Sequence, residues 1–342
     1  MISVFRPFSL NYGIGDQVGQ GVSSFSHTIE NLTRDTEIKP LHSHNDYWRK
    51  QPLFDALSYG CQSVEADIWY FPEKYEVERT ITETTKDGKE KDKLTTSTFE
   101  NNKIYVGHNQ VYLDPSLTLS KLYLDPLYRF LKYSNPKFIY KDKNPVTEDF
   151  DSKHGVFYNS PETPLYFWLD FKTDPHETYQ ALMPILQPFI DQGFLAHYDT
   201  VNDKFIPGPL IITITGNAPV EEIEKETTRY VFIDAPLKLF KSGTPQDELE
   251  RYSKLSIIAS GSMQELIGQE SYSSSKTREL NFNDEKNLEE YFQTAHKYNL
   301  KTRIWGGITW PNYLRNSHLK TLWKLGCDLL NVDNLNDASE VF

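Results

Sequence analysis

The amino-acid sequence predicts an α/β protein of the (β/α)8 barrel class. Eight β-branched or aromatic runs recur along the 342 residues, and stretches with amphipathic helical periodicity lie between them. Eight strands with intervening helices are the content of a (β/α)8 TIM barrel. A doubly wound open sheet is the competing architecture, but no GxGxxG turn follows the first run.

Each of the eight runs is expected to form one barrel strand. In chain order they cover residues 38–44, 63–71, 165–171, 210–216, 230–236, 255–261, 301–307 and 328–334. Helix candidates with apolar residues at i, i+3 and i+4 cover residues 52–60, 176–193, 287–300 and 311–326. Gly60, Gly193 and Gly326 lie where a glycine commonly ends a helix.

Three segments are expected to be additions to a single barrel domain over residues 38–342. Residues 1–37 are polar and irregular, and we expect them to wrap the barrel as an N-terminal arm. The charged, threonine-rich residues 74–103 predict a hairpin insertion that turns at Asp87-Gly88. Residues 134–164 lack periodicity and predict a loop insertion, either a wall of the substrate mouth or a solvated decoration. For residues 74–103 we favour the decoration.

Composition excludes several classes of protein. Asp and Glu number 48 against 36 Lys and Arg, and the net charge of −12 argues against general nucleic-acid binding, which needs a basic face. No run reaches the roughly 20 apolar residues of a transmembrane helix, and the first residues lack the apolar core of a signal peptide. We expect a monomer without a membrane span, cytoplasmic by default.

The two cysteines exclude a disulfide framework and a four-thiolate zinc site. Cys61 precedes the second strand and Cys327 precedes the eighth. In a closed barrel the first strand lies between these two strands. Their Cα atoms should therefore be roughly 10 Å apart, beyond disulfide reach. We predict two free thiols.

Polar residues end the first three strands. Side chains two apart on a strand share a face, so three pairs are expected to converge: His42 with His44, Glu65 with Asp67, and Asp170 with Lys172. Burying three carboxylates needs a counter-charge, and a hard divalent cation with oxygen ligands supplies one. His108 ends a further short strand-like run after the hairpin.

Each of these features also has a structural explanation. An isolated Asp170–Lys172 pair is more often part of a structural network, but its combination with the other pairs favours a site. Asp234 and Asp333 also fall at strand ends, where they would orient other groups or cap loops. Trp69, Trp168, Trp305 and Trp310 are interpreted mainly as packing residues, although a strand-end Trp can line a ligand pocket.

Two other enzyme classes fit less well. Metal-dependent amidohydrolases also begin with HxH on the first barrel strand, but they need histidines at the ends of strands five and six. Here those strands end in Asp234 and in Ser260-Gly261. A retaining glycosidase would use two carboxylates from opposite sides of the sugar, whereas Glu65 and Asp67 lie on one strand.

The segments HNDYW, PLFDALSYGCQSVEADIW, YVGHN and YFWLDFKT resemble the phospholipase-C-like phosphodiesterase superfamily, which includes glycerophosphodiester phosphodiesterases and spider-venom sphingomyelinase D. A longer ordered series, including SPET, TGN, DAPL, YSKLS, KTRIWG and LGCDLLNVDNL, is similar to the fungal family of altered inheritance of mitochondria protein 6. The resemblance implies a barrel of the PLC-like type and allows membrane or organelle association, since members often carry an N-terminal anchor.

The resemblance also implies roles for individual residues. It makes His44 and His108 the acid/base pair, Glu65, Asp67 and Asp170 the ligands of Mg²⁺ (or Ca²⁺), and Lys172 a phosphate contact. His44 is preferred to His42 because it lies 21 residues before Glu65 and is followed by Asn45, close to the spacing of the venom enzymes. We add Asn45 and Trp305 as candidate substrate contacts, and His42 and Asp234 as candidates that orient the site.

These observations predict a metal-dependent phosphoric diester hydrolase, or a cyclising phosphodiesterase. Its expected substrate is a glycerophosphodiester or a phospholipid-like diester, cleaved by two-histidine acid–base catalysis. The alternative from another class is a catalytically silent barrel that serves as a ligand-binding or scaffold protein. The intact histidines and carboxylates weigh against that alternative.

Overall fold

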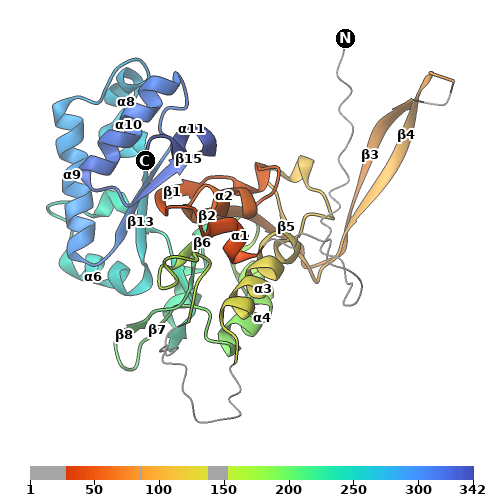
Figure 1. Ribbon diagram of the computed structural model, residues 1–342, viewed down its shortest axis with the longest axis horizontal. Helices are drawn as coiled ribbons and strands as arrows, with labels where there is room; N and C mark the ends of the chain where they lie inside the picture. The colour runs from red at the N-terminus through yellow and green to blue at the C-terminus, as the bar shows by residue number, and fades with distance from the viewer. Residues whose placement is uncertain (1–27, 85–86, 138–152) are drawn as a thin grey trace.

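The computed structural model describes residues 28–84, 87–137 and 153–342. Its centre is a ten-stranded sheet with the order β11-β9-β6-β2-β1-β15-β14-β13-β12, and β5 pairs with β2 beside this path. The pairings along the path are all parallel. The sheet curls into a nearly closed barrel, consistent with a TIM-like fold (Figure 1).

All eight predicted strand runs are confirmed. The strands on the path are β1 Lys39–Ser43, β2 Cys61–Tyr70, β6 Leu165–Phe171, β9 Leu210–Gly216, β11 Val231–Ile233, β12 Ala235–Pro236, β13 Ile258–Ser262, β14 Lys301–Trp305 and β15 Leu329–Val332. The run 230–236 differs from the others because it breaks at Asp234 into β11 and β12. Since β11 pairs with β9 and β12 pairs with β13, this one run joins both ends of the sheet path.

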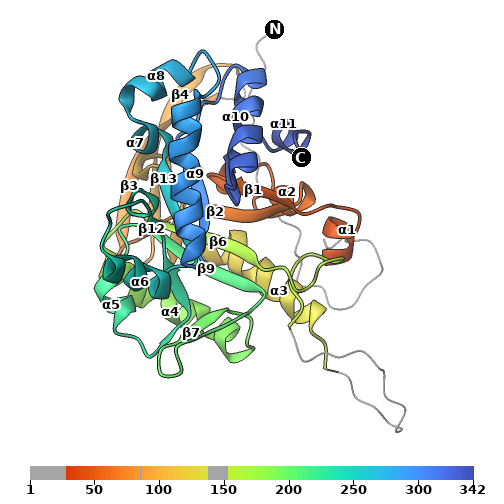
Figure 2. The ribbon, with the colours of Figure 1, turned by 90° about the vertical axis from the view of Figure 1, so that its left-hand side faces the viewer.

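The four predicted helices are also found, although the helix expected over 287–300 spans Phe282–Lys297. The helices are α1 Ile29–Thr33, α2 Phe54–Ser58, α3 Asp125–Ser134, α4 Pro175–Asp191, α5 Val220–Glu224, α6 Gln246–Leu255, α7 Met263–Ile267, α8 Gln269–Ser275, α9 Phe282–Lys297, α10 Asn312–Leu325 and α11 Leu335–Ser339. Gly60, Gly193 and Gly326 follow α2, α4 and α10 with positive φ, which glycine adopts easily. Helices α9 and α10 lie side by side over β14 and β15 (Figure 2).

Strand alternation separates the barrel's two faces. On β6, Phe167 and Leu169 belong to the large core beneath the helices, while Tyr166 and Trp168 belong to a separate buried cluster with Ile211 and other inward residues. By the same alternation Asp170 follows Trp168 on the inner face. The apolar cluster therefore fills the amino-terminal part of the barrel, and polar groups lie above it at the carboxyl ends of the strands.

The threonine-rich segment forms an antiparallel hairpin of β3 Tyr75–Thr84 and β4 Glu90–Phe99, with Asp87 and Gly88 in its connection. The hairpin extends away from the body of the molecule (Figure 1). Its base packs in a small cluster with β5 Ile104–Val106, where Phe99 and Tyr105 are fully buried. Arg79 donates to the backbone oxygens of Val111 (2.8 Å) and Leu113 (3.1 Å), in the segment that follows His108.

The loop over residues 134–164 lies at the wrong end of the barrel to wall the mouth. Residues 138–152 are outside the described residues, but the rest joins the end of α3 to the start of β6, which is the amino-terminal end of the strands. There Val156 and Phe157 are buried, and Val156 O accepts from Thr33 Oγ1 (3.0 Å) on α1. The mouth interpretation is therefore wrong for the described part of this loop.

The remaining elements lie outside the barrel path. Strands β7 His197–Asp199, β8 Lys204–Ile206 and β10 Thr228–Arg229 form a small antiparallel sheet. Residues 1–27 of the predicted arm lie outside the described residues, whereas α1 at its end packs into the core through Ile29 and Leu32. Cys61 and Cys327 are buried free thiols, as predicted. In the described ranges, no helix combines the length and apolar character needed to cross a membrane.

Candidate active site

The loop after β1 is fixed by one buried carboxylate. Asp46 accepts hydrogen bonds from Ser43 Oγ (2.7 Å), from the backbone N–H of Leu53 (2.6 Å) and from the Tyr123 hydroxyl (3.0 Å). Burial raises the pKa of Asp46 even though these three donors favour the ionised form. The loop between these anchors carries His44 and Asn45 at the carboxyl end of the barrel.

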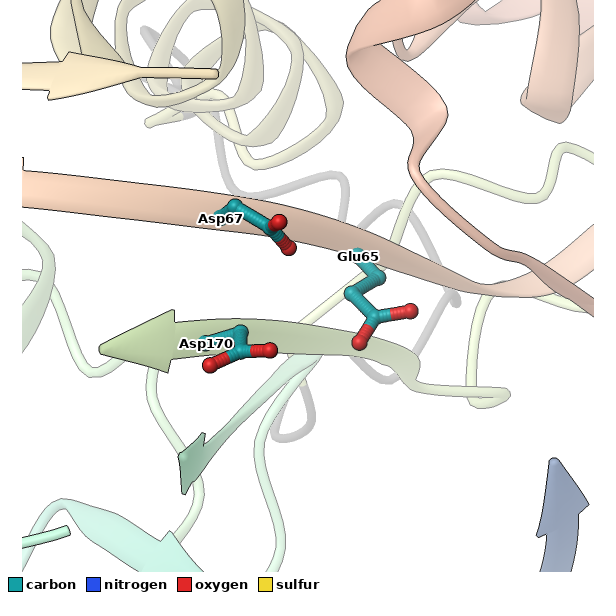
Figure 3. A group of neighbouring side chains, drawn as sticks. All are labelled: Glu65, Asp67 and Asp170. Carbon is teal, nitrogen blue, oxygen red and sulfur yellow. The ribbon is translucent and has the colours of Figure 1, made fainter. Parts of the chain in front are cut away.

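Three carboxylates converge at this end of the barrel (Figure 3). Glu65 and Asp67 lie on β2, and Asp170 lies on the neighbouring β6 directly opposite Asp67 in the parallel register. One oxygen from each side chain lies within 4.8 Å of the other two. Glu65 and Asp67 are buried, and Asp170 is partly buried. The predicted pairing of these strand-end residues is therefore found in the structure.

Glu65 is held between a neutral and a cationic partner. His42 Nε2 lies 3.0 Å and an Arg303 guanidinium nitrogen 3.2 Å from Glu65 Oε2. Burial raises the pKa of Glu65, but the Arg303 charge and the His42 hydrogen bond outweigh it and hold this pKa well below its usual range. Burial, with the Arg303 charge, lowers the pKa of His42 to about 3, so this imidazole is neutral. Its Nδ1 then accepts from Ser63 Oγ (2.7 Å).

Lys172 compensates the other two carboxylates. Its Nζ lies 2.6 Å from Asp170 Oδ2 and 3.2 Å from Asp67 Oδ2. Burial raises the pKa of Asp170, and the nearby ammonium only partly opposes this effect. The Tyr47 hydroxyl lies 2.9 Å from Asp67 Oδ2 and 2.8 Å from Asn45 Oδ1, so it links the loop after β1 to the cluster.

Two imidazoles flank the carboxylate cluster, and each has its Nδ1 against a carboxylate. His44 Nδ1 lies 2.7 Å from Asp333 Oδ1, and His108 Nδ1 lies 3.0 Å from Asp67 Oδ2. A carboxylate partner fixes the proton on Nδ1 and leaves Nε2 as the basic nitrogen. His44 Nε2 lies 3.9 Å from Glu65 Oε2. The hydrogen bond from His44 lowers the pKa of Asp333 against the effect of burial, so Asp333 stays ionised.

The donor set fits a hard divalent cation. Glu65, Asp67 and Asp170 offer three converging carboxylate oxygens, the ligands that Mg²⁺ and Ca²⁺ prefer. The described cations beside them are Lys172 and Arg303, so three negative charges face two positive ones. A bound divalent cation would more than offset the single negative charge that remains.

The other predicted residues occupy different positions around this centre. Asn45 is buried with φ of 47°, and its side chain is engaged with Tyr47. Trp305 ends β14 with 44% of its surface exposed. Asp234 accepts from Ser260 and from Thr215 (3.4 Å) rather than contacting the three carboxylates. Burial raises the pKa of Asp234 to about 6, and its Oδ1 has no hydrogen-bond partner among the described residues.

Two contributors were not predicted in these roles: Arg303 and Tyr47. Arg303 lies in the strand run KTRIW on the inward side, and a charged residue inside a barrel strand is a readable signal. Asp333 follows the eighth strand and was expected to orient other groups or to cap a loop, and its contact with His44 is of the first kind. Tyr47 has no signal in the sequence, because its contact with Asp67 depends on how the loop after β1 folds.

Comparisons with known proteins identify relatives of this chain. A sequence model of the AIM6-like phosphodiesterase domain matches residues 30–95 and 95–234. Altered inheritance of mitochondria protein 6 of Saccharomyces cerevisiae is 36% identical over 330 residues, which cover 92% of this chain and 73% of that protein. The proteins of the same name from Eremothecium gossypii and Lachancea thermotolerans are 35% and 33% identical, covering 91% and 92% of this chain and 72% and 68% of their own.

No solved structure matches the chain. The matched residues of the domain include the loop after β1, both carboxylates of β2, and His108 and Asp170. The domain model matches two successive stretches of the chain, and the relatives align with more than nine-tenths of it. These matches are sufficient to assign the chain to a family. This chain therefore belongs to the family of the AIM6-like phosphodiesterase domain.

Proposed function

We propose that this chain is a metal-dependent phosphodiesterase of the PLC-like type, acting on a glycerophosphodiester or a phospholipid-like diester. One observation carries the proposal. Three carboxylates converge at the carboxyl end of the barrel, and an imidazole with its Nδ1 held by a carboxylate lies on either flank. Active sites of TIM barrels lie at this end.

Glu65, Asp67 and Asp170 would hold Mg²⁺, with Ca²⁺ as the alternative ion. When bound, the cation supplies positive charge that neutralises the non-bridging oxygens of the phosphodiester. Lys172 adds a second cationic contact for the same oxygens, since its ammonium already lies at the cluster edge. His42 and Arg303 keep Glu65 oriented and ionised from below.

His44 and His108 carry the proton transfers in this proposal. One Nε2 takes the proton of the attacking hydroxyl, and the other, protonated, gives its proton to the leaving alkoxide. Such general acid or base groups typically contribute about 10²–10⁴-fold each. Asp333 stabilises the imidazolium of His44 and fixes its ring, because the carboxylate lies 2.7 Å from Nδ1. The attacking hydroxyl belongs either to water or to the substrate itself.

Phosphorus NMR of a phosphodiester panel tests the proposal. The panel contains glycerophosphodiesters, lysophospholipids, sphingomyelin and inositol phosphodiesters, each with Mg²⁺ and again with a chelator. Turnover that needs the metal is expected, and a cyclic product identifies attack by a substrate hydroxyl rather than by water. His108→Ala is expected to lower the rate by about 10²-fold or more.

His296→Ala is the matched control. His296 also bonds a carboxylate, Asp328 at 2.8 Å, but it lies at the end of α9, at the amino-terminal end of the barrel strands. The control should keep wild-type activity below its unfolding temperature. Metal binding without turnover on any diester would favour the ligand-binding barrel, and the absence of both would overturn the assignment of the carboxylates.

A further inference from the structure

A cavity of about 370 Å³ adjoins the candidate site on the side of His44. It lies outside the barrel wall, between the carboxyl ends of β14 and β15 and helix α10. Ile304 and Val332 line it from the strands, and Leu319 and Leu322 line it from the helix. Its volume is within the range of pockets that hold small molecules.

Several polar groups on its wall are already engaged. Arg315 donates to Asp337 (3.1 Å), and His318 Nε2 lies 3.1 Å from the backbone oxygen of Arg278. Asn331 Oδ1 accepts from Arg303 (2.6 Å). Most of the described wall presents hydrocarbon to an occupant, and a charged or multiply hydroxylated group would lose hydration there for few new partners.

The cavity opens onto the proposed chemistry. His44 and Asp333 both belong to its lining, and His44 Nε2 lies 3.9 Å from Glu65 Oε2. Gly306 and Gly307, which have no side chains, also belong to its lining. A cavity whose lining joins an imidazole and a carboxylate to an apolar wall suits an amphiphilic ligand.

We propose that this cavity is the subsite for the hydrocarbon portion of the substrate, and that the ester oxygen bearing this hydrocarbon is the one served by His44. The inference rests on the proposed function and narrows it to amphiphilic phosphodiesters with one apolar alcohol. Diesters that are polar on both sides would leave the cavity unused and be poorer substrates.

Calorimetric titration with n-alkyl phosphates tests this subsite without turnover, because these probes are monoesters. Methyl, butyl, hexyl and octyl phosphate are compared in the presence of Mg²⁺. Each methylene that enters the cavity should tighten binding roughly fourfold until the cavity is filled. A parallel series from butanol to octanol, which lacks the phosphate, should show the same dependence on chain length with weaker binding.

Two variants and a control locate the binding. Leu322→Ala enlarges the cavity and should extend the chain length at which the affinity stops increasing, whereas Ala338→Leu fills part of it and should shorten that length. Leu249→Ala on α6 removes an equally buried leucine, 4% exposed like Leu322, outside the cavity lining. It should leave the chain-length dependence unchanged.

The outcomes separate the two proposals. Equal affinity for methyl and octyl phosphate, with no chain dependence for the alcohols, would overturn the hydrocarbon subsite and leave the phosphate site standing. Chain-dependent binding of alcohols without any binding of phosphates would overturn the proposed function and keep the subsite. Equal shifts with Leu322→Ala and Leu249→Ala would show that the hydrocarbon binds elsewhere.

Discussion

Gly216 offers a direct test of the carboxylate cluster. This glycine ends β9 beside Asp170 and has a φ of 69°, a left-handed conformation that costs other residues about 1–2 kcal/mol. A Cβ added here would lie 2.1 Å from Asp170 Oδ1 and 2.7 Å from the backbone oxygen of Phe171, where ordinary contacts begin at 3.4 Å. Backbone cannot yield easily, so we expect Gly216→Ala to push the Asp170 carboxylate out of the cluster.

The size of the effect follows from the sensitivity of metal sites. Ligand distances must hold to within about 0.2 Å, and disturbing the groups around a ligand typically costs about 10–100-fold in metal affinity. We expect a loss of this size for Mg²⁺ in calorimetric titration of Gly216→Ala. The variant should also unfold at lower urea concentration than the wild type.

Gly268→Ala separates the clash from the backbone strain. Gly268 has a φ of 83°, and a Cβ there meets no described atom within 4 Å, so its alanine variant carries the strain alone. It should lose stability but bind Mg²⁺ like the wild type. The reasoning is refuted if Gly216→Ala binds Mg²⁺ as tightly as Gly268→Ala does.

Three further predictions concern buried charges. Arg303→Met leaves Glu65 without its cationic partner inside the barrel and should lower the free energy of unfolding by about 3 kcal/mol. Excess Mg²⁺ should restore part of this loss. Urea unfolding with and without Mg²⁺ would measure the loss and its recovery. Burial raises the pKa of Asp328, but the hydrogen bond from His296, the Lys301 charge and the Thr302 N–H together outweigh burial and lower this pKa. The resulting stabilisation is present above the unfolded pKa of about 4 and is lost as pH falls through the folded value. Unfolding of Asp328→Asn should depend less on pH below that point, and an unchanged acid slope would contradict this. Asp46→Asn replaces one carboxylate oxygen by an NH₂ group, which cannot accept the hydrogen bonds that Asp46 now receives. The variant should lower the free energy of unfolding by about 1–3 kcal/mol and speed hydrogen exchange in residues 44–53. Exchange at the wild-type rate there would contradict the role of Asp46.

The strands and the carboxylate cluster could be predicted because both follow from local periodicity. Glu65 and Asp67 are two apart on one strand, and Asp170 lies near the end of the next barrel strand. Alternation along each strand and the parallel pairing of the two strands bring the three to one face. The same rule gives His42 and His44. The break at Asp234 could not be read this way, since it depends on how the sheet path closes on itself.

Contacts between segments far apart in the sequence account for the side-chain partners that were not predicted. Asp333 and His44 are separated by 289 residues, and only barrel closure brings their side chains to 2.7 Å. The loop over 134–164 was misplaced for a different reason. It precedes β6, and a loop that leads into a barrel strand lies at the amino-terminal end, so chain order alone excludes it from the mouth.

The hairpin of β3 and β4 divides into a part open to engineering and a part that is not. Toward the connection at Asp87 and Gly88 its side chains are exposed, so an epitope or a fluorescent label inserted there should leave the barrel undisturbed. Near the base, Arg79 donates hydrogen bonds to backbone oxygens of the segment that follows His108. A one-residue deletion there would turn Arg79 to the other face of the ribbon and release that stretch. We therefore expect the outer part of the hairpin to tolerate changes of length. The inner part must keep its strand register, because Arg79 holds the segment that follows the His108 imidazole.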